Sequence, residues 1–352
     1  FIGRKHALEG DQTISLEYKT ITRLGIPFFS LTTGRLQRSL TRYTLLSLLR
    51  VPIGFVQSLC QLIKVKPNVI LSFGGYIALP VALAGWLLRI PIITHEQSVV
   101  PGLATKIISR IAYRVCVSWP QSLGFFPKEK TRLTGNPIRL EIFNFQFSIF
   151  NKIPISQFPN KKLPLIYITG GNLGAHAINE VVANILPRLL EKYRIIHQCG
   201  DSQIYRDYGQ LSVVSCQLSV EQRKRYLLTK YVESEDIGWV LNNADLVISR
   251  AGANTVTELA ALAKPAIFIP LPWAGQQEQL ANASLLEKIG SAVILPQEKL
   301  TGQSLYQCIE SLIQNIDKYK ENSKKAQKLV DLKAADKLVE VINEAKKQTN
   351  SS

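Results

Sequence analysis

The residues best suited to binding or catalysis lie in ISRAGANTVTELAALAKP, residues 248–265. Here an apolar strand runs through a turn of small residues into a helix. The start of that helix carries Thr255, Thr257 and Glu258. Amide groups at a helix N-terminus bind phosphate, and a carboxylate beside them can accept hydrogen bonds from both hydroxyls of a ribose. The spacing T-x-x-E is also that of a capping box, in which both side chains only satisfy backbone N–H groups. Capping is the commoner use of this spacing, and the spacing alone leaves both interpretations open.

Three other loops carry residues suited to a sugar nucleotide. Gly170, Gly171 and Gly174, in ITGGNLGAHAIN, stand between a strand and a helix, where glycine either admits a phosphate or simply allows a tight turn. The side-chain amides of residues 276–282 both donate and accept hydrogen bonds, as sugar hydroxyls require, although a solvated helix start has the same composition. Arg139, in GNPIR, is a candidate partner for a phosphate or an ordinary surface arginine.

His95 and Glu96, in THEQS, follow a further strand, but a lone pair of this kind is more often structural than catalytic. The sequence contains no D-x-D, P-loop, GxSxG, HExxH or GxGxxG motif. None of the five cysteines forms a CxxC pair, which argues against a zinc cluster or a disulfide framework. We therefore expect no metal site, no nicotinamide cofactor and a reducing compartment.

Alternating apolar strands and helices must position these residues. Strands are expected in 69–75, 91–97 and 114–119, and a second series of strands begins with LPLIYITGG. This alternation predicts an α/β fold with two Rossmann-like domains whose parallel sheets face each other across a cleft. The expected division of the chain is a first domain (1–142), a linker (143–162), a second domain (163–325) and a final helix packing back on the first domain (326–352).

The net charge of +16 is concentrated in one half of the chain. Residues 1–140 contain 18 Lys and Arg against 5 Asp and Glu, and so carry +13 of that charge. Such an imbalance indicates an anionic partner, either a nucleic acid or a membrane surface. Residues 34–66 set four arginines among leucines, a pattern that suits a lipid interface, and aromatic residues are not interleaved with the basic ones as they are in single-strand binders. The basic half is therefore expected to dock on an anionic membrane.

Six segments in one order resemble the MurG family: FGGYIALP, THEQSVVPGLATK, GNPIR, GGNLGAHAIN, ISRAGANTVTELAALAKPAIFIPLP and EQLANA. These glycosyltransferases move N-acetylglucosamine from UDP-GlcNAc to undecaprenyl-pyrophosphoryl-MurNAc-pentapeptide (lipid I), making lipid II. The resemblance implies a GT-B fold and an inverting, metal-independent transfer without cofactors. It also implies a peripheral position on the cytoplasmic face of the bacterial cell membrane, with UDP-GlcNAc and undecaprenyl-linked lipid I as partners and no nucleic acid.

The resemblance also implies site residues. On the donor side, Glu258 matches the glutamate that binds the ribose hydroxyls, Thr255 lies beside the phosphates, and Asn172 stands where the family usually has a phosphate-contacting serine. The remaining donor positions are Arg139 for phosphate, Gln279 for the GlcNAc hydroxyls and Val232, whose backbone meets the uracil. The acceptor-side candidates are Tyr76, His95, Glu96 and Ser98. The family's first glycine-rich loop and its histidine are expected before Phe1, so neither a catalytic residue nor a general base is assigned.

Three alternatives remain open at this point. The charge of the first half also fits a nucleic-acid-binding protein, whose affinity would fall with rising salt. Another GT-B enzyme, such as a glycolipid glycosyltransferase or a UDP-sugar epimerase, would share the donor-side motifs. A non-catalytic homologue would keep the fold without the activity.

Overall fold

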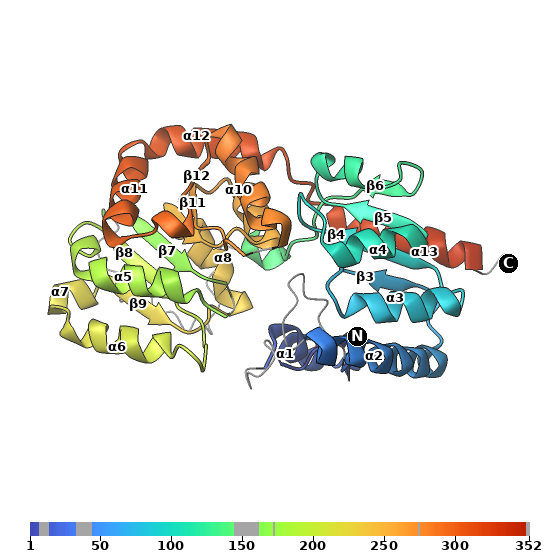
Figure 1. Cartoon of the computed structure of the whole chain (residues 1–352). Coiled ribbons are helices and arrows are strands. Elements are labelled where there is room, and N and C mark those ends of the chain that lie inside the picture. Colours follow the sequence, from blue (N-terminus) through green and yellow to red (C-terminus); the bar gives the residue numbers. More distant parts are fainter. Residues whose placement is uncertain (7–13, 33–43, 144–161, 172, 274, 350–352) are drawn as a thin grey trace. The chain divides into compact units, whose positions relative to one another are not determined.

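The computed structural model describes the chain apart from residues 7–13, 33–43, 144–161, 172, 274 and 350–352 (Figure 1). The described chain forms two compact units, residues 1–137 with 331–352 and residues 138–330. Nearly all of the expected linker, 143–162, lies outside the described residues. Each unit contains a parallel sheet with helices packed on it, which confirms the predicted α/β class.

The first unit is built on four parallel strands in the order β3-β4-β5-β6. Successive side chains of a strand face opposite sides of a sheet, and both sides are covered here. Ile92 packs with residues of α3 and α4, whereas its neighbour Ile93 packs with residues of α13, the last helix of the chain. The elements are β1 (Ile2–Gly3), α1 (Leu16–Arg23), β2 (Phe29–Ser30), α2 (Thr44–Val65), β3 (Ile70–Ser72), α3 (Ala78–Leu87), β4 (Ile92–Glu96), α4 (Leu103–Ile111), β5 (Arg114–Val117), η1 (Pro120–Phe125), β6 (Thr131–Leu133) and α13 (Ala334–Thr349).

The second unit has six parallel strands in the order β12-β11-β10-β7-β8-β9. Helices α8, α9, α10 and α12 cover one face of the sheet, and α5 and α11 cover the other (Figure 1). The elements are η2 (Leu140–Phe143), β7 (Leu165–Thr169), α5 (His176–Leu189), β8 (Arg194–Gln198), α6 (Asp207–Gln217), α7 (Val220–Arg223), β9 (Tyr226–Thr229), α8 (Ser234–Asn243), β10 (Leu246–Ser249), α9 (Ala253–Ala261), β11 (Ala266–Phe268), η4 (Gly275–Gln277), α10 (Glu278–Ile289), β12 (Ala292–Ile294), η5 (Gln297–Lys299), α11 (Gly302–Gln314) and α12 (Ile316–Gln327).

The strand order of the second unit fixes where a ligand can bind. From β7 the chain moves outward through β8 to β9, and then returns to place β10 on the other side of β7. The loops that leave the carboxyl ends of β7 and β10 therefore diverge, and open α/β sheets bind ligands in the crevice at such a switch point. The described residues 170, 171 and 173–175 belong to the loop after β7, here called the glycine loop, and residues 250–252 lead from β10 into α9.

The structure adds several short strands to those expected from the sequence. The pair β1–β2 has two residues in each strand, and β12 has three, which is too short for an apolar pattern to stand out. The apolar stretch near residues 77–88 forms α3, with six buried residues between Leu79 and Gly85. Within the described part of the chain, no helix combines the length and apolarity needed to cross a bilayer.

Candidate functional site

Helix α9 begins before the residues that resemble a capping box. Its N-cap is Gly252, and no side chain caps it. Thr255 and Glu258 both lie inside the helix, so the capping interpretation of the T-x-x-E spacing is wrong. The amide groups of the first turn of a helix have no partner within the helix and carry the positive end of its dipole. This end of α9 therefore presents amide donors at the switch point, with Thr255 half-buried in its first turn.

Glu258 forms a bidentate ion pair with Arg139. Arg139 Nε donates to one carboxylate oxygen at 2.8 Å, and Nη2 donates to the other at 3.0 Å. The Glu258 side chain is 10% exposed and that of Arg139 is 36% exposed. Burial lowers the pKa of Arg139, but the hydrogen bond and charge of Glu258 outweigh that effect and raise it. The guanidinium therefore stays charged, and the two hydrogen bonds hold each side chain in a fixed orientation.

The ion pair leaves polar atoms for a ligand. Each carboxylate oxygen has two lone-pair sites, and the guanidinium occupies one on each. Among the described residues, Nη1 of Arg139 has no hydrogen-bond partner. Glu258 can therefore accept ribose hydroxyls while Nη1 remains able to donate to a phosphate.

The glycine loop is packed backbone against backbone. A Cβ atom on Gly170 would lie 2.1 Å from Ala175 N, and one on Gly174 would lie 1.9 Å from the Cys199 carbonyl oxygen. Gly200 is equally confined, since its Cβ would lie 2.3 Å from Gly174 N. Close packing thus accounts for Gly170 and Gly174, as the tight-turn interpretation of the sequence predicts.

The other predicted donor residues line loops of the same unit. Gln279 Oε1 accepts the Leu271 N–H at 2.9 Å, while its Nε2 has no partner among the described residues. Val232 is 3% exposed and donates its N–H to Gln198 Oε1 at 3.1 Å. Asn172 lies outside the described residues.

The acceptor-side candidates belong to the first unit. His95 is fully buried, and its Nε2 lies 2.9 Å from the carbonyl oxygen of Gly135. Because a carbonyl only accepts, Nε2 carries the proton, and burial lowers the pKa of the ring. His95 thus ties the THEQS strand to the GNPIR turn. Ser98 is 8% exposed. The centroid of the Tyr76 ring lies 4.9 Å from the guanidinium carbon of Arg4.

Glu96 holds the loop that follows β4. Its Oε1 accepts the Ser98 N–H at 3.1 Å and its Oε2 accepts the Gly102 N–H at 3.2 Å. Gly102 is the N-cap of α4, so the Glu96 carboxylate fixes the loop at the residue from which this helix starts. Burial raises the pKa of Glu96, and these hydrogen bonds only partly offset the rise.

Glu96→Gln is expected to lower the free energy of unfolding by about 1–3 kcal/mol, because the amide NH₂ cannot accept one of the two N–H groups. Since the folded pKa is raised, the wild-type carboxyl contributes stability below its unfolded pKa and loses that contribution as pH rises through its folded pKa. The difference in the free energy of unfolding between wild type and variant is therefore expected to widen as pH falls. Denaturant titrations at several pH values measure it, and a gap independent of pH would contradict the raised pKa.

Three residues near the switch point were not singled out from the sequence. Gln198 ends β8, Tyr167 lies in β7, and Arg250 follows β10. Arg250 donates to the carbonyl oxygens of Ile269 at 2.9 Å and Pro270 at 3.4 Å, and so holds the loop after β11. Burial lowers the pKa of Arg250 to about 10. A polar residue at the carboxyl end of an expected strand is the signal that could have found Gln198 and Arg250.

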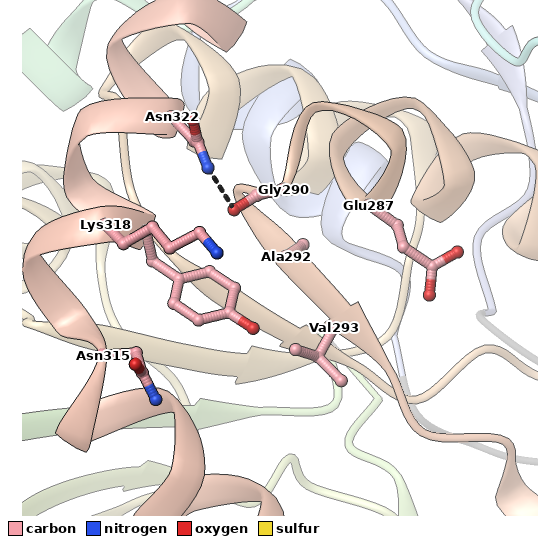
Figure 2. Close-up of a pocket in the computed structure, with 8 residues that line it drawn as sticks. Glu287, Gly290, Ala292, Val293, Asn315, Lys318 and Asn322 are labelled. Atoms are coloured by element: carbon pink, nitrogen blue, oxygen red, sulfur yellow. Dashed lines mark hydrogen bonds between the residues drawn. The ribbon is translucent and has the colours of Figure 1, made fainter.

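A separate surface pocket of about 450 Å³ lies beside the edge strand β12 (Figure 2). Asn322 Nδ2 donates to the Gly290 carbonyl oxygen at 3.2 Å across one side of this pocket (Figure 2). None of the predicted donor residues that the structure describes lines it. In the described part of the chain, no group of three or more His, Cys, Asp or Glu side chains could hold a metal ion.

Comparisons with known proteins show the family of the chain. Residues 12–117 match the glycosyltransferase family 28 N-terminal domain, and residues 165–341 match the corresponding C-terminal domain. The chain is 36% identical over 311 residues to a *Bacillus cereus* protein, covering 88% of this chain and 84% of that protein. A *Lachnoclostridium phytofermentans* protein is 35% identical over 334 residues, covering 94% and 88%. Both are named UDP-N-acetylglucosamine–N-acetylmuramyl-(pentapeptide) pyrophosphoryl-undecaprenol N-acetylglucosamine transferase.

A solved structure gives the same result for the fold. The crystal structure of *Acinetobacter baumannii* MurG superposes with a TM-score of 0.66 at 29% identity, covering 94% of this chain and 88% of that one. The predicted GT-B type of fold is thereby confirmed.

Proposed function

The chain belongs to the MurG family within glycosyltransferase family 28, and we infer that its second unit binds the sugar-nucleotide donor at the β7–β10 switch point. The enzyme transfers N-acetylglucosamine from UDP-GlcNAc to lipid I, which forms lipid II. The observation that carries the site assignment is Glu258, a buried carboxylate in α9 whose uncapped N-terminus lies at the switch point. Two hydroxyls of a ribose are suitable donors for the lone pairs that Arg139 leaves free.

The remaining donor contacts follow from groups that lack partners within the described chain. The Thr255 hydroxyl and Nη1 of Arg139 would donate to the diphosphate, and Nε2 of Gln279 would donate to a hydroxyl of the sugar. The carbonyl oxygen of Val232 would accept the N3–H of uracil, which cytosine lacks. Asn172 stays a prediction for a phosphate contact.

The transfer develops negative charge on the diphosphate. The acceptor's C4 hydroxyl attacks the anomeric carbon, the bond from that carbon to the diphosphate breaks, and the hydroxyl proton passes to a base. One displacement inverts the configuration at the anomeric carbon. We assign stabilisation of the departing UDP to the N-terminus of α9 and to Arg139, so the proposed transfer needs no metal ion.

In the first unit we propose acceptor contacts for Tyr76 and Ser98, and positioning roles for His95 and Glu96. His95 and Glu96 support this division because both are buried and hold backbone groups of the surrounding loops.

Incubation with radiolabelled UDP-GlcNAc and lipid I, in the presence of EDTA, tests the proposed function. Label is expected in lipid II, with none in lipid when lipid I is omitted. Conversion of UDP-GlcNAc to an isomeric UDP-sugar without acceptor would instead identify an epimerase. Release of UDP without labelled lipid, or no reaction, would contradict the transfer.

We also propose that the first unit docks on anionic lipid. Helix α2 exposes an apolar stripe, defined as Ile53, Val56, Cys60 and Ile63, at helical spacing. Ile53, Val56 and Ile63 are 49%, 56% and 53% exposed. Three of the four arginines of 34–66 lie outside the described residues, and the side chain of the fourth, Arg50, is not described. The structural support for docking therefore comes from this stripe.

Further exposed apolar and basic side chains lie at the ends of α2 and α3 or just after them. Val65, at the end of α2, is exposed, as are Trp86 and Leu87 at the end of α3. These helices pack together and lead into β3 and β4, which pair from Ile70 and Ile92 onward. The exposed basic residues here, called the basic rim, are Lys64, Lys66 and Arg89. Apolar side chains beside cations suit a bilayer interface with anionic headgroups, where each basic residue contributes about 1 kcal/mol.

The double variant Val56→Glu with Ile63→Glu is expected to reduce binding to phosphatidylglycerol vesicles by at least about ten-fold, because it removes apolar burial and adds two negative charges. Vesicle sedimentation at low salt measures the effect. Val213→Glu is a matched control, since Val213 is 60% exposed on α6 of the other unit and is expected to leave binding unchanged. Equal binding of wild type to neutral and anionic vesicles, or an unaffected double variant, would refute the docking surface.

A further inference from the structure

One buried side chain connects the segments that carry the proposed donor contacts. Gln198 ends β8 and is 4% exposed. Its Oε1 accepts hydrogen bonds from Tyr167 Oη at 2.9 Å and from Val232 N at 3.1 Å. Its Nε2 donates to the carbonyl oxygen of Gly171 at 3.0 Å. Both ends of the amide are thus engaged, which fixes the rotation of the side chain.

The partners of Gln198 come from three parts of the proposed site. Gly171 belongs to the glycine loop after β7, and Val232 belongs to the segment after β9. Strands β7 and β9 are not neighbours, because β8 lies between them. From the end of this middle strand, Gln198 contacts the loops on both sides.

The third partner belongs to the strand that precedes the glycine loop. Tyr167 is buried in β7 and packs in the same core cluster as Val256 and Leu259 of α9. Gln198 is therefore linked through Tyr167 to the core cluster that includes α9, the helix that carries the carboxylate proposed to bind ribose.

Both the N–H and the carbonyl group of Gly171 form hydrogen bonds. Its N–H donates to Thr169 Oγ1 at 3.0 Å, while its carbonyl accepts from Gln198. A φ of 81° is accessible to glycine at little cost, so this residue can present its carbonyl to Gln198 without strain. If the amide of Gln198 were lost, the loop would keep its local hydrogen bonds, from Gly171 N to Thr169 Oγ1 and from Gly174 N to the Gly171 carbonyl oxygen, but it would lose the side-chain link to Val232.

We propose that Gln198 is a positioning residue that sets the spacing between the diphosphate and uracil ends of the donor site, by joining the glycine loop to the Val232 segment. The proposal rests on the donor site inferred above and adds a determinant of its geometry. Gln198 itself need not touch the nucleotide. Its loss therefore weakens a ligand that spans both loops more than ligands that occupy one of them.

The test compares UDP with its two halves. Gln198→Met keeps the length of an unbranched side chain and removes all three hydrogen bonds. We expect calorimetry to give a UDP affinity at least about ten-fold lower, the equivalent of one or two neutral hydrogen bonds. NMR titrations with uridine and with pyrophosphate are expected to give affinities within about two-fold of wild type, a change below half a kcal/mol.

Two further variants keep the test decisive. Gln198→Asn retains the amide but is shorter by one methylene, so it is expected to lose the link and reproduce the UDP effect even if Gln198→Met fails to fold. Gln327→Met is the control. Among the described residues, the Gln327 side chain donates to the Ala261 carbonyl oxygen and to no donor-site residue, so UDP affinity is expected to stay at the wild-type value.

The possible outcomes distinguish failure of the proposed donor site from failure of the positioning role of Gln198. A wild-type protein that does not bind UDP contradicts the proposed donor site itself. Wild-type binding with undiminished UDP affinity in both Gln198 variants, whatever their melting temperatures, overturns the positioning role. An equal loss for uridine and UDP would also overturn it, because Gln198 would then act on the uracil end alone.

Discussion

Gly174→Ala is expected to lower the free energy of unfolding of the second unit by more than about 4 kcal/mol, an effect at the upper extreme for a single substitution. The added Cβ would lie 1.9 Å from the Cys199 carbonyl oxygen and 2.8 Å from its carbon, so backbone must move. Gly174 also has a φ of 77°, which L side chains disfavour. The displaced backbone belongs to the end of β8, beside Gln198, and we therefore expect UDP binding to be lost as well.

Gly171→Ala is the matched control, because Gly171 has a similar φ of 81° but a Cβ there would meet nothing within 4 Å. Only the left-handed backbone is then penalised, at about 1–2 kcal/mol. Denaturant unfolding of both variants, followed by circular dichroism, separates packing from conformation. Equal destabilisation of the two would contradict the close approach of the loops after β7 and β8.

Glu258→Gln is expected to weaken UDP binding by about ten-fold or more. The substitution replaces a charged acceptor by one neutral acceptor and a donor, and hydrogen bonds to charged groups contribute roughly 1.5–3 kcal/mol. The variant also leaves the Arg139 guanidinium without its ion pair. Because Arg139 is 36% exposed, water can solvate it, and we expect a loss of stability of only about 1 kcal/mol.

Thr255→Val provides the comparison for Glu258→Gln, since it removes one hydroxyl from the same helix without disturbing the ion pair. A loss of UDP affinity of a few-fold, from one phosphate contact, is expected, with little change in stability. Calorimetric titration of UDP and thermal unfolding of both variants check these values. Undiminished UDP affinity in Glu258→Gln, together with reduced stability, would leave Glu258 a structural role only.

The sequence pattern was sufficient to predict the alternating strands and helices. Apolar runs ending in small or polar residues predicted the strands beside the switch point, β7 and β10, and placed Glu258 in the helix after β10. The pattern failed where a local motif competed with tertiary structure. T-x-x-E favoured a cap at Thr255, whereas Gly252 adopts the extended cap conformation and α9 starts from it.

Contacts between distant residues could not be read from the sequence. Arg139 and Glu258 are 119 residues apart, and no local spacing indicates that a candidate phosphate ligand is also the partner of a candidate ribose ligand. Gln198 meets partners 27, 31 and 34 residues away, on three different segments. Such pairings depend on strand order, and the alternation of strands and helices predicts a parallel sheet without giving that order.

The most direct test of the inferred donor site is a crystal structure of the protein with UDP-GlcNAc. We expect the ribose hydroxyls within hydrogen-bond distance of the Glu258 carboxylate, with the diphosphate at the N-terminus of α9 and the uracil at the Val232 carbonyl. The Arg139–Glu258 ion pair is expected to persist, with Nη1 of Arg139 directed to a phosphate oxygen. A nucleotide bound elsewhere, with the Glu258 carboxylate hydrogen-bonded to Arg139 and to no part of the nucleotide, would contradict the inferred donor site.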